Sequence, residues 1–357
     1  MPFYRSVLEG SGGGGGGGGG TSPYVTISTT GEMPIVDAFN FAYYNSYSEH
    51  DVNVFGSINK ITFGNAINSA YYMFAGRNSF NADIDCSNAT NLLNMQSLCE
   101  DVDEFNSNII FPNNINAQLE SEYSSVSFSC GSILSRCYNY DKPINFKVHD
   151  ICTGNELASY ADFSYALSNC NKFNSRVVFD LKKYQRNSSN SELDVIQYQC
   201  RETFDNCSMF NQPVIFPAGL QDISGVFNNC FNFNQPVVFD LYGMGYYVYF
   251  TNLFRNLPNM CSDIIFLNSE NLIAQTNMFG NFVNNSRSNT INIYIDNVSG
   301  IKSNNITGQG SITWTETASP FGYTTYSNSA YKISIIDNAQ YGLDKFNNYY
   351  NNFYNIE

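Results

Sequence analysis

The feature that most constrains the fold is a pattern that occurs twice in the middle of the chain. Residues 204–216 read FDNCSMFNQPVIF, and residues 227–239 read FNNCFNFNQPVVF. A pattern repeated at a fixed offset indicates a repeat architecture, in which each copy buries its apolar face against its neighbours. The fold must therefore be considered as a stack of units before any motif is interpreted.

Seven units can be aligned on the residue that opens FNQP, here called the anchor, which is aromatic in six of them. The anchors are Phe80, Phe105, Tyr140, Phe173, Phe210, Phe233 and Met260. Apolar residues also stand ten and six positions before each anchor, and steps of four, three and three are typical of one face of a helix or 3₁₀ segment. Four and six positions after the anchor the spacing changes to period two, which indicates a strand. The sequence predicts one short helix, a polar turn and one short strand per unit, stacked into a solenoid with a parallel sheet.

The residue after the anchor is Asn or Asp in six of the seven units. Asn and Asp side chains commonly hydrogen-bond to backbone groups in turns. We therefore expect this position to be structural and not a ligand site.

These strings resemble the repeats of BspA-type leucine-rich repeat surface proteins, including mycoplasmal surface lipoproteins with an FNQPL-type repeat. The resemblance is carried by FNQPV with Phe-x-x-Cys just before it, and it extends over about residues 65–292. Those relatives often carry Trp-Asp after the strand, where this chain has Phe179-Asp180 and Phe239-Asp240. The resemblance implies a leucine-rich-repeat-like fold and a role in binding, not in chemistry.

Four segments are expected along the chain: residues 1–20, 21–64, 65–292 and 293–357. The first holds a short leader, MPFYRSVLE, and a polyglycine run at 12–20, which is read either as a flexible tether or as packed polyglycine helices. The second contains strand-like runs and is expected to cap the repeats. The last is expected to hold a β-hairpin, from residues 311–317 and 331–337, and an Asn/aromatic-rich tail.

The start of the chain also resembles the N-termini of tail or head fibre proteins of gut bacteriophages, because an MPxYR-type leader runs into polyglycine. The leader has no apolar core of the kind found in secretory signal peptides. Net charge is −14 and no apolar run reaches the length of a membrane span, so neither nucleic acid nor membrane insertion is expected. These features favour a virion protein assembled in the host cytoplasm.

Three consecutive anchor-to-anchor intervals are longer than the others, and their extra residues lie within 113–129, 147–161 and 181–199. Insertions at equivalent points of adjacent repeats emerge on one face, which is often the binding face, although tolerated surface loops explain them equally well. The insertions bring four tyrosines out of the repeat register: Tyr123, Tyr160, Tyr184 and Tyr198. Tyrosine suits contact because it offers a large area and a hydroxyl.

A second candidate surface is formed by the residues five positions after each anchor, which point away from the core. Five of these seven residues are β-branched and apolar: Ile110, Val178, Ile215, Val238 and Ile265. Such a stripe reflects strand propensity, or it is covered by another subunit or by the C-terminal segment.

No catalytic, metal or cofactor site is expected. Eight of the ten cysteines occupy core positions and are expected to be buried, reduced thiols. The sequence His149-Asp150-x-Cys152 lacks an orienting partner and an oxyanion motif. The carboxylate pairs Glu120/Glu122 and Glu192/Asp194 would suit a glycan hydrolase only if their separation fitted one.

The sequence thus favours a non-enzymatic bacteriophage fibre or receptor-binding appendage. It would attach to other virion proteins through its N-terminus and contact a host glycan or protein through the repeats. The alternatives are a decoration or assembly protein of the virion head or tail, and a bacterial surface adhesin. Homo-oligomerisation is also compatible with the covered stripe.

Overall fold

The structure is a computed structural model that describes residues 24–27, 60–64, 69–115, 127–152, 160–185, 195–243, 250–269, 290–296, 315–318, 324–328 and 333–354. Its strands are β1 (Tyr24–Ile27), β2 (Lys60–Phe63), β3 (Asp83–Asp85), β4 (Ile109–Ile110), β5 (Ser127–Ser129), β6 (Ile144–Cys152), β7 (Tyr160–Asp162), β8 (Val177–Gln185), β9 (Gln197–Gln199), β10 (Val214–Phe216), β11 (Leu220–Asp222), β12 (Val237–Asp240), β13 (Ile264–Leu267), β14 (Ile291–Ile295), β15 (Thr315–Ala318), β16 (Thr324–Asn328) and β17 (Ile333–Asp337). The helix in this part of the chain is α4 (Ala339–Tyr354). The described protein is therefore mostly parallel β-structure with one helix.

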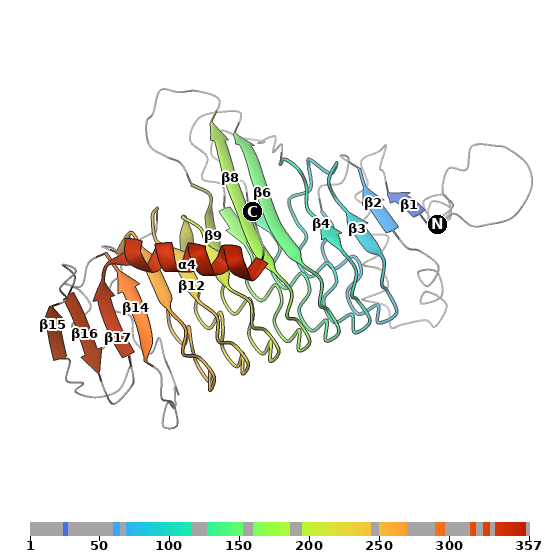
Figure 1. Cartoon of the computed structure of the whole chain (residues 1–357). Helices are drawn as coiled ribbons and strands as arrows, with labels where there is room; N and C mark the ends of the chain where they lie inside the picture. Colours follow the sequence, from blue (N-terminus) through green and yellow to red (C-terminus); the bar gives the residue numbers. More distant parts are fainter. Residues whose placement is uncertain are drawn as a thin grey trace, which may run out of the picture.

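The strands that follow the anchors lie side by side and in register, and together they are called the front wall (Figure 1). Val214 is paired with Val237, and Val237 with Ile264, so equivalent residues of successive units are direct neighbours. The same parallel pairing joins β1 to β2 and β2 to β3. The strands predicted after each anchor, and the strand-like runs before the first unit, are confirmed.

A second set of parallel strands, β5, β7, β9 and β11, forms the rear wall. These strands lie eleven to thirteen residues before their anchors, directly ahead of the predicted helix. The four units that contain these strands therefore contribute one strand to each wall, and the core fills the space between.

The predicted short helix of each unit is wrong. The residues between the rear-wall strand and the anchor form successive turns, and in all seven units the residues eight and four positions before the anchor have positive φ. Those residues are Tyr72 and Gly76, Ser97 and Asp101, Ser132 and Arg136, Tyr165 and Asn169, Glu202 and Asn206, Gly225 and Asn229, and Asn252 and Asn256. An α-helix needs φ near −60° at every residue, so a left-handed residue at every fourth position excludes it.

The backbone hydrogen bonds show what replaces the helix. The amide N–H groups of Phe163, Tyr165 and Leu167 donate to carbonyls of the next unit, at 2.9, 2.8 and 3.0 Å. The intervening N–H groups donate within their own unit, as from Ala166 to the carbonyl of Phe163 at 3.1 Å. Every second amide therefore joins neighbouring units, and the turn segments form a ladder as continuous as the strands.

A side-chain ladder runs along the residue after each anchor. Asn211 Oδ1 accepts the backbone N–H of Asn234 at 2.8 Å, and Asn234 Oδ1 accepts that of Cys261 at 2.8 Å. The same bond recurs from Asn81 through Asn106, Asp141 and Asn174 to Asn211. The structural role predicted for this position is confirmed, although each bond reaches the next unit and not the residue's own turn.

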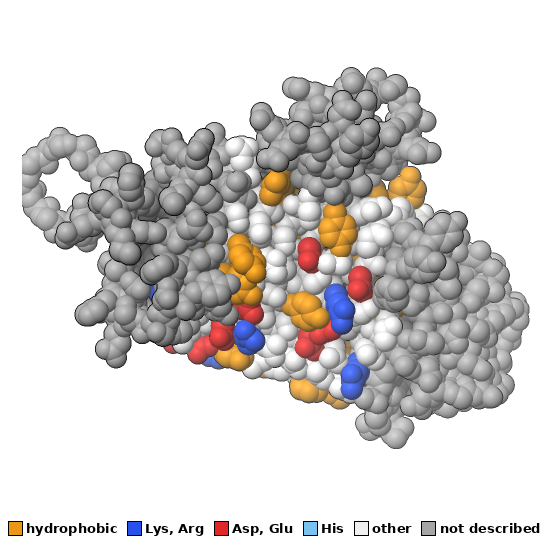
Figure 2. All heavy atoms as spheres, turned by 180° about the vertical axis from the view of Figure 1, so that it is seen from behind, with side chains coloured by type: hydrophobic (Ala, Val, Ile, Leu, Met, Phe, Trp, Pro, Cys, Tyr) orange, Lys and Arg blue, Asp and Glu red, His pale blue; other side chains and the backbone are white. Residues whose placement is uncertain are grey.

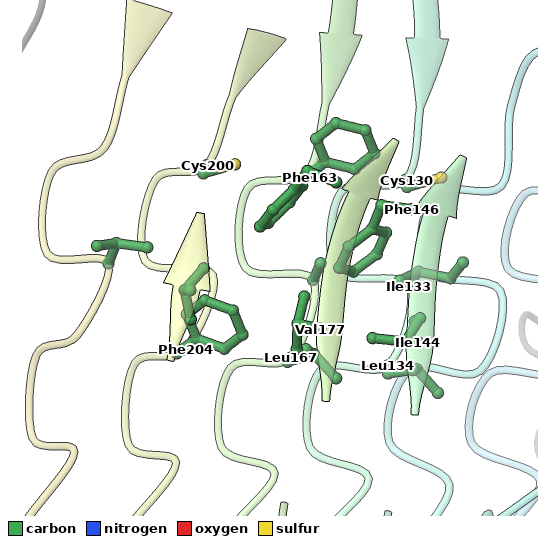
Figure 3. Packing of buried hydrophobic residues seen from close by; sticks show 14 of the residues in the cluster. Cys130, Ile133, Leu134, Ile144, Phe146, Phe163, Leu167, Val177, Cys200 and Phe204 are labelled. Atoms are coloured by element: carbon green, nitrogen blue, oxygen red, sulfur yellow. The ribbon is translucent and has the colours of Figure 1, made fainter. Parts of the chain in front are cut away.

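The core is built from columns of aromatic rings. Anchors of adjacent units stack at centroid separations of 5.5–5.9 Å, from Phe80 through Tyr140 to Phe233. A second column runs along the front wall from Phe146 to Phe266 at 5.0–5.3 Å. In Figure 3 the apolar side chains of both walls, such as Phe146 and Phe163, point into the same interior.

The cysteines form a third buried row. All eight predicted core cysteines are buried and free. In four successive units the thiol three positions before the anchor donates to the carbonyl of the preceding unit: Cys137 to Cys99, Cys170 to Leu134, Cys207 to Leu167 and Cys230 to Phe204, at 2.8–3.1 Å. A small apolar side chain with a weak donor fits this position, which accounts for the Phe-x-x-Cys pattern.

Tyr140 is the one anchor with a hydroxyl, and this hydroxyl is fully buried with no partner among the described residues. An unsatisfied buried hydroxyl costs about 1–3 kcal/mol. We expect Tyr140→Phe to raise the free energy of unfolding by about 1 kcal/mol, measured by urea denaturation. A loss of stability would mean that the hydroxyl is satisfied.

The C-terminal part continues the front wall. Strand β17 pairs in parallel with β14, and β16 and β15 follow it as an antiparallel meander. The predicted hairpin is therefore wrong in its pairing, because β16 lies between the two predicted strands. The Asn/aromatic-rich tail forms most of α4, which packs on β12, β13 and β14.

Candidate interaction surface

The three predicted insertions leave the stack at one edge. Strands β6 and β8 are nine residues long, whereas β10 has three, and they pair in parallel along their whole length. Figure 1 shows this pair reaching beyond the neighbouring strands. The second and third insertions thus begin as extensions of front-wall strands, whereas β4, before the first insertion, has only two residues. Residues 116–126, 153–159 and 186–194 lie outside the described residues.

The four tyrosines of the insertions do not share one environment. Tyr160, at the start of β7, is partly buried, and burial raises the pKa of its hydroxyl. Tyr184 belongs to β8, but its side chain lies outside the described residues, as does Tyr123.

Tyr198 is not a contact residue. Its side chain is fully buried between Phe163 and Phe179, and its hydroxyl donates to the carbonyl of Pro217 at 2.7 Å. Its prediction as a partner-binding residue is wrong because residue 198 is the inward-pointing residue of the rear-wall strand β9, which the sequence reading had placed in an insertion.

A side-chain contact between His149 and Asp180 joins β6 and β8 where they leave the stack. His149 Nε2 lies 2.9 Å from Asp180 Oδ2, and Lys182 Nζ lies 3.2 Å from Asp180 Oδ1. Burial would raise the pKa of the Asp180 carboxyl, but the hydrogen bonds from His149 and Lys182 outweigh it and hold that pKa below its usual range. The pair ties the two extended strands together, and we interpret His149 as a structural residue.

The stripe of residues five positions after the anchors is divided into two halves. Val238 and Ile265 are 1% and 0% exposed, and they form a small apolar cluster with Tyr294 and with Phe346 of α4. Ile215 and Ile110 are 38% and 46% exposed, and Val178 is partly buried. The alternative in which the C-terminal segment covers the stripe is confirmed for Val238 and Ile265, which are therefore not available to a partner.

Polar contacts fix α4 across several units. Tyr349 donates to Gln235 Oε1 at 2.5 Å, and Tyr354 donates to Gln212 Oε1 at 3.1 Å. At its N-terminal half, Lys345 Nζ lies 2.6 Å from Asp263 Oδ2 and donates to the Tyr294 hydroxyl at 3.0 Å.

The far end of α4 is held by one cation. The guanidinium of Arg176 lies 5.5 Å from the Tyr350 ring and 4.6 Å from the Tyr354 ring, and its Nε donates to the Tyr350 hydroxyl at 3.2 Å. The sequence reading did not identify these residues, although apolar residues at 346, 349, 350, 353 and 354 have helical spacing that could have revealed the helix.

Gly342 sets how closely α4 approaches the sheet. A Cβ at this position would lie 2.5 Å from Cγ and 2.7 Å from Cβ of Tyr294, which are atoms close to the backbone of a packed strand. Alanine is the better helix former by about 1 kcal/mol, but this steric conflict opposes it. We expect Gly342→Ala to lower the free energy of unfolding of α4 by about 1–3 kcal/mol, measured by hydrogen exchange of the helix amides. Asn348→Ala, at an exposed position, is the control and should leave that exchange unchanged.

The described residues contain eight buried core thiols. Burial raises the pKa of each core thiol, which suppresses the reactive thiolate. They hold no cluster of His, Cys, Asp and Glu that could bind a metal ion. The side chains of Asp150 and Cys152, and both candidate carboxylate pairs, lie outside the described residues. The helix α4 is too short and too polar to cross a bilayer, and no other described helix does so.

The comparisons with known proteins agree with the repeat pattern. The family described as "Mycoplasma protein of unknown function, DUF285" matches residues 53–132 and 179–294, which together are more than half of the chain. No curated protein and no solved structure matches the chain. The repeated units, with their FNQP turns and parallel strands, thus place this chain in the DUF285 family.

Proposed function

We propose that this chain is a non-enzymatic binding protein, a fibre or receptor-binding appendage of a bacteriophage virion. In this proposal the units form a leucine-rich-repeat-like solenoid that serves as a rigid scaffold, and the insertion edge contacts the host surface. The N-terminal leader docks to other virion proteins, and the polyglycine run separates the scaffold from the docking point.

The observation that carries the proposal is the paired extension of β6 and β8 from a stack that is otherwise uniform. Continuous ladders of backbone and Asn hydrogen bonds hold that stack, so an insertion at its edge has a fixed platform. Binding residues on loops positioned by a rigid scaffold are the common arrangement in recognition proteins. The virion setting is supported by the leader and polyglycine alone.

A second candidate function is a bacterial surface adhesin. It is favoured by the family match and by the similarity of the FNQP repeats to those of BspA-type surface proteins. A decoration or assembly protein of the head or tail is the third, and it would use the same edge to bind other virion proteins.

Localisation separates these candidates. Antibodies raised against the full chain would be used for immunogold electron microscopy of purified particles and of producing cells, with mass spectrometry of both fractions. The fibre proposal predicts that the label lies on projecting appendages of the particles. Label on the capsid surface would favour a decoration protein, and label confined to the bacterial envelope would contradict the virion proposal.

A further inference from the structure

The three insertions leave the front wall from neighbouring positions. The described chain stops after Ile115 before the first insertion, after β6 before the second, and after β8 before the third. These three segments belong to successive units of the stack, and Figure 1 shows β4, β6 and β8 following one another in that order. The outgoing ends of the insertions therefore lie side by side.

His149 of β6 contacts both of the neighbouring outgoing ends. On one side its backbone carbonyl accepts the N–H of Ile115 at 2.8 Å. On the other side its imidazole Nε2 lies 2.9 Å from Oδ2 of Asp180, which belongs to β8. A single residue on the middle segment thus joins the outgoing ends of all three insertions.

Two further side-chain contacts lie on the same line across the units. Lys147 Nζ donates to Asn113 Oδ1 at 3.0 Å, and Lys182 Nζ lies 3.2 Å from Asp180 Oδ1. His149 is 8% exposed, whereas the other four residues of these contacts are partly buried or exposed. A buried polar side chain needs a partner, and a carboxylate at 2.9 Å provides one. His149 is therefore the central contact of this line.

The insertions also return to the rear wall side by side. The first residues of the three rear-wall strands that follow them are in register, because Ser127 is paired with Tyr160 and Tyr160 with Gln197. Figure 2 shows this side of the molecule as mostly uncharged polar surface, on which apolar and charged side chains are scattered. Backbone pairing thus aligns the returning ends, while His149 adds a side-chain contact at the outgoing ends.

We infer that His149 is a positioning residue that makes the three insertions one composite binding surface. This inference rests on the proposed function, in which the insertion edge contacts the partner. Ordering a loop on binding costs conformational entropy, and a surface whose parts are already placed relative to one another loses less. His149 would supply that placement at the point where the insertions leave the scaffold.

Hydrogen exchange on the full chain tests whether the outgoing ends are coupled. His149→Leu removes the contact with Asp180, so the amides of residues 181–185 and of Ile115 should both exchange about tenfold faster. The urea midpoint should change little, because local opening of the extended strands leaves the aromatic columns intact. His149→Gln retains an N–H that can reach Asp180, and it should keep both exchange rates within about twofold of the wild type.

Lys172→Leu is the matched control. Lys172 Nζ donates to Asn139 Oδ1 at 2.7 Å, so this substitution also removes a side-chain contact between the units of β6 and β8, but on the turn edge close to the anchors. It should leave the exchange of Ile115 and of residues 181–185 unchanged, and it should not alter binding.

Flow cytometry with the fluorescently labelled chain, on cells of the bacterium whose culture releases the protein, tests what the coupling serves. His149→Leu should raise the apparent Kd roughly tenfold, while His149→Gln and the control should label as the wild type does. Faster exchange at residues 181–185 without a change at Ile115, or faster exchange at both with undiminished labelling, would overturn the inference. If the wild-type chain labels no cells, the proposed function is wrong, and the exchange rates alone decide whether His149 couples the outgoing ends.

Discussion

Phe210→Ala is expected to lower the free energy of unfolding by about 3–5 kcal/mol, the range for truncating a fully buried aromatic residue. Phe210 is 0% exposed, and its ring stacks on those of Phe173, Phe204, Phe227 and Phe233 at centroid separations of 4.6–6.4 Å. These rings come from three successive units. Removing one ring therefore weakens both unit–unit contacts that Phe210 makes, and such contacts supply most of the stability of a repeat array.

Urea denaturation followed by near-ultraviolet absorbance would measure this loss, and hydrogen exchange would show whether it is centred on residues 195–243. Phe231→Ala is the control, because Phe231 is 48% exposed and should change stability by less than about 0.5 kcal/mol. An equal effect of the two substitutions would contradict the claim that the stacked aromatic columns stabilise the array.

Asn229→Val is expected to lower the free energy of unfolding by about 2–3 kcal/mol, for two separate reasons. Asn229 has a φ of 59°, and a β-branched residue is strained in that region. Its amide also links three units, because Nδ2 donates to Asn206 Oδ1 at 3.0 Å and Oδ1 accepts from Asn256 Nδ2 at 2.7 Å.

Asn229→Gly separates these causes, since glycine accepts positive φ without strain but removes the amide. We expect Asn229→Gly to lower the free energy of unfolding by about 1 kcal/mol. The additional loss in Asn229→Val would then come from backbone strain. If both substitutions lower the free energy of unfolding equally, residue 229 is not in a strained left-handed conformation. That result would favour a helical turn at this position.

The strands could be predicted from the sequence and the turns could not, for a physical reason. Alternation of Val214, Ile215 and Phe216 has one common structural meaning, whereas apolar steps of four, three and three fit either a helix or a series of turns. A further signal was present, because Asn or Gly stands at several of the left-handed positions, such as Asn206 and Gly225. It was hidden by units that place Tyr165 and Glu202 there.

The candidate surface could likewise be predicted only in part from the sequence. The position of the insertions followed from unit length alone, and β6 and β8 do extend there. Tyr198 was misplaced because the rear-wall strands had no counterpart in the predicted unit. The coverage of Val238 and Ile265 depends on α4, which is distant in sequence, so only the alternative of C-terminal coverage could be stated beforehand.

We propose that this chain works by binding through its insertion edge. The most direct test compares the fluorescently labelled full chain with a variant whose three long intervals are trimmed to the 23–27-residue spacing of the other units. Flow cytometry would use cells of the bacterium whose culture releases the protein. We predict that the trimmed chain keeps its urea midpoint but no longer labels the cells. A trimmed chain that folds and labels them undiminished would contradict the claim and move recognition to the stripe of Ile110, Val178 and Ile215.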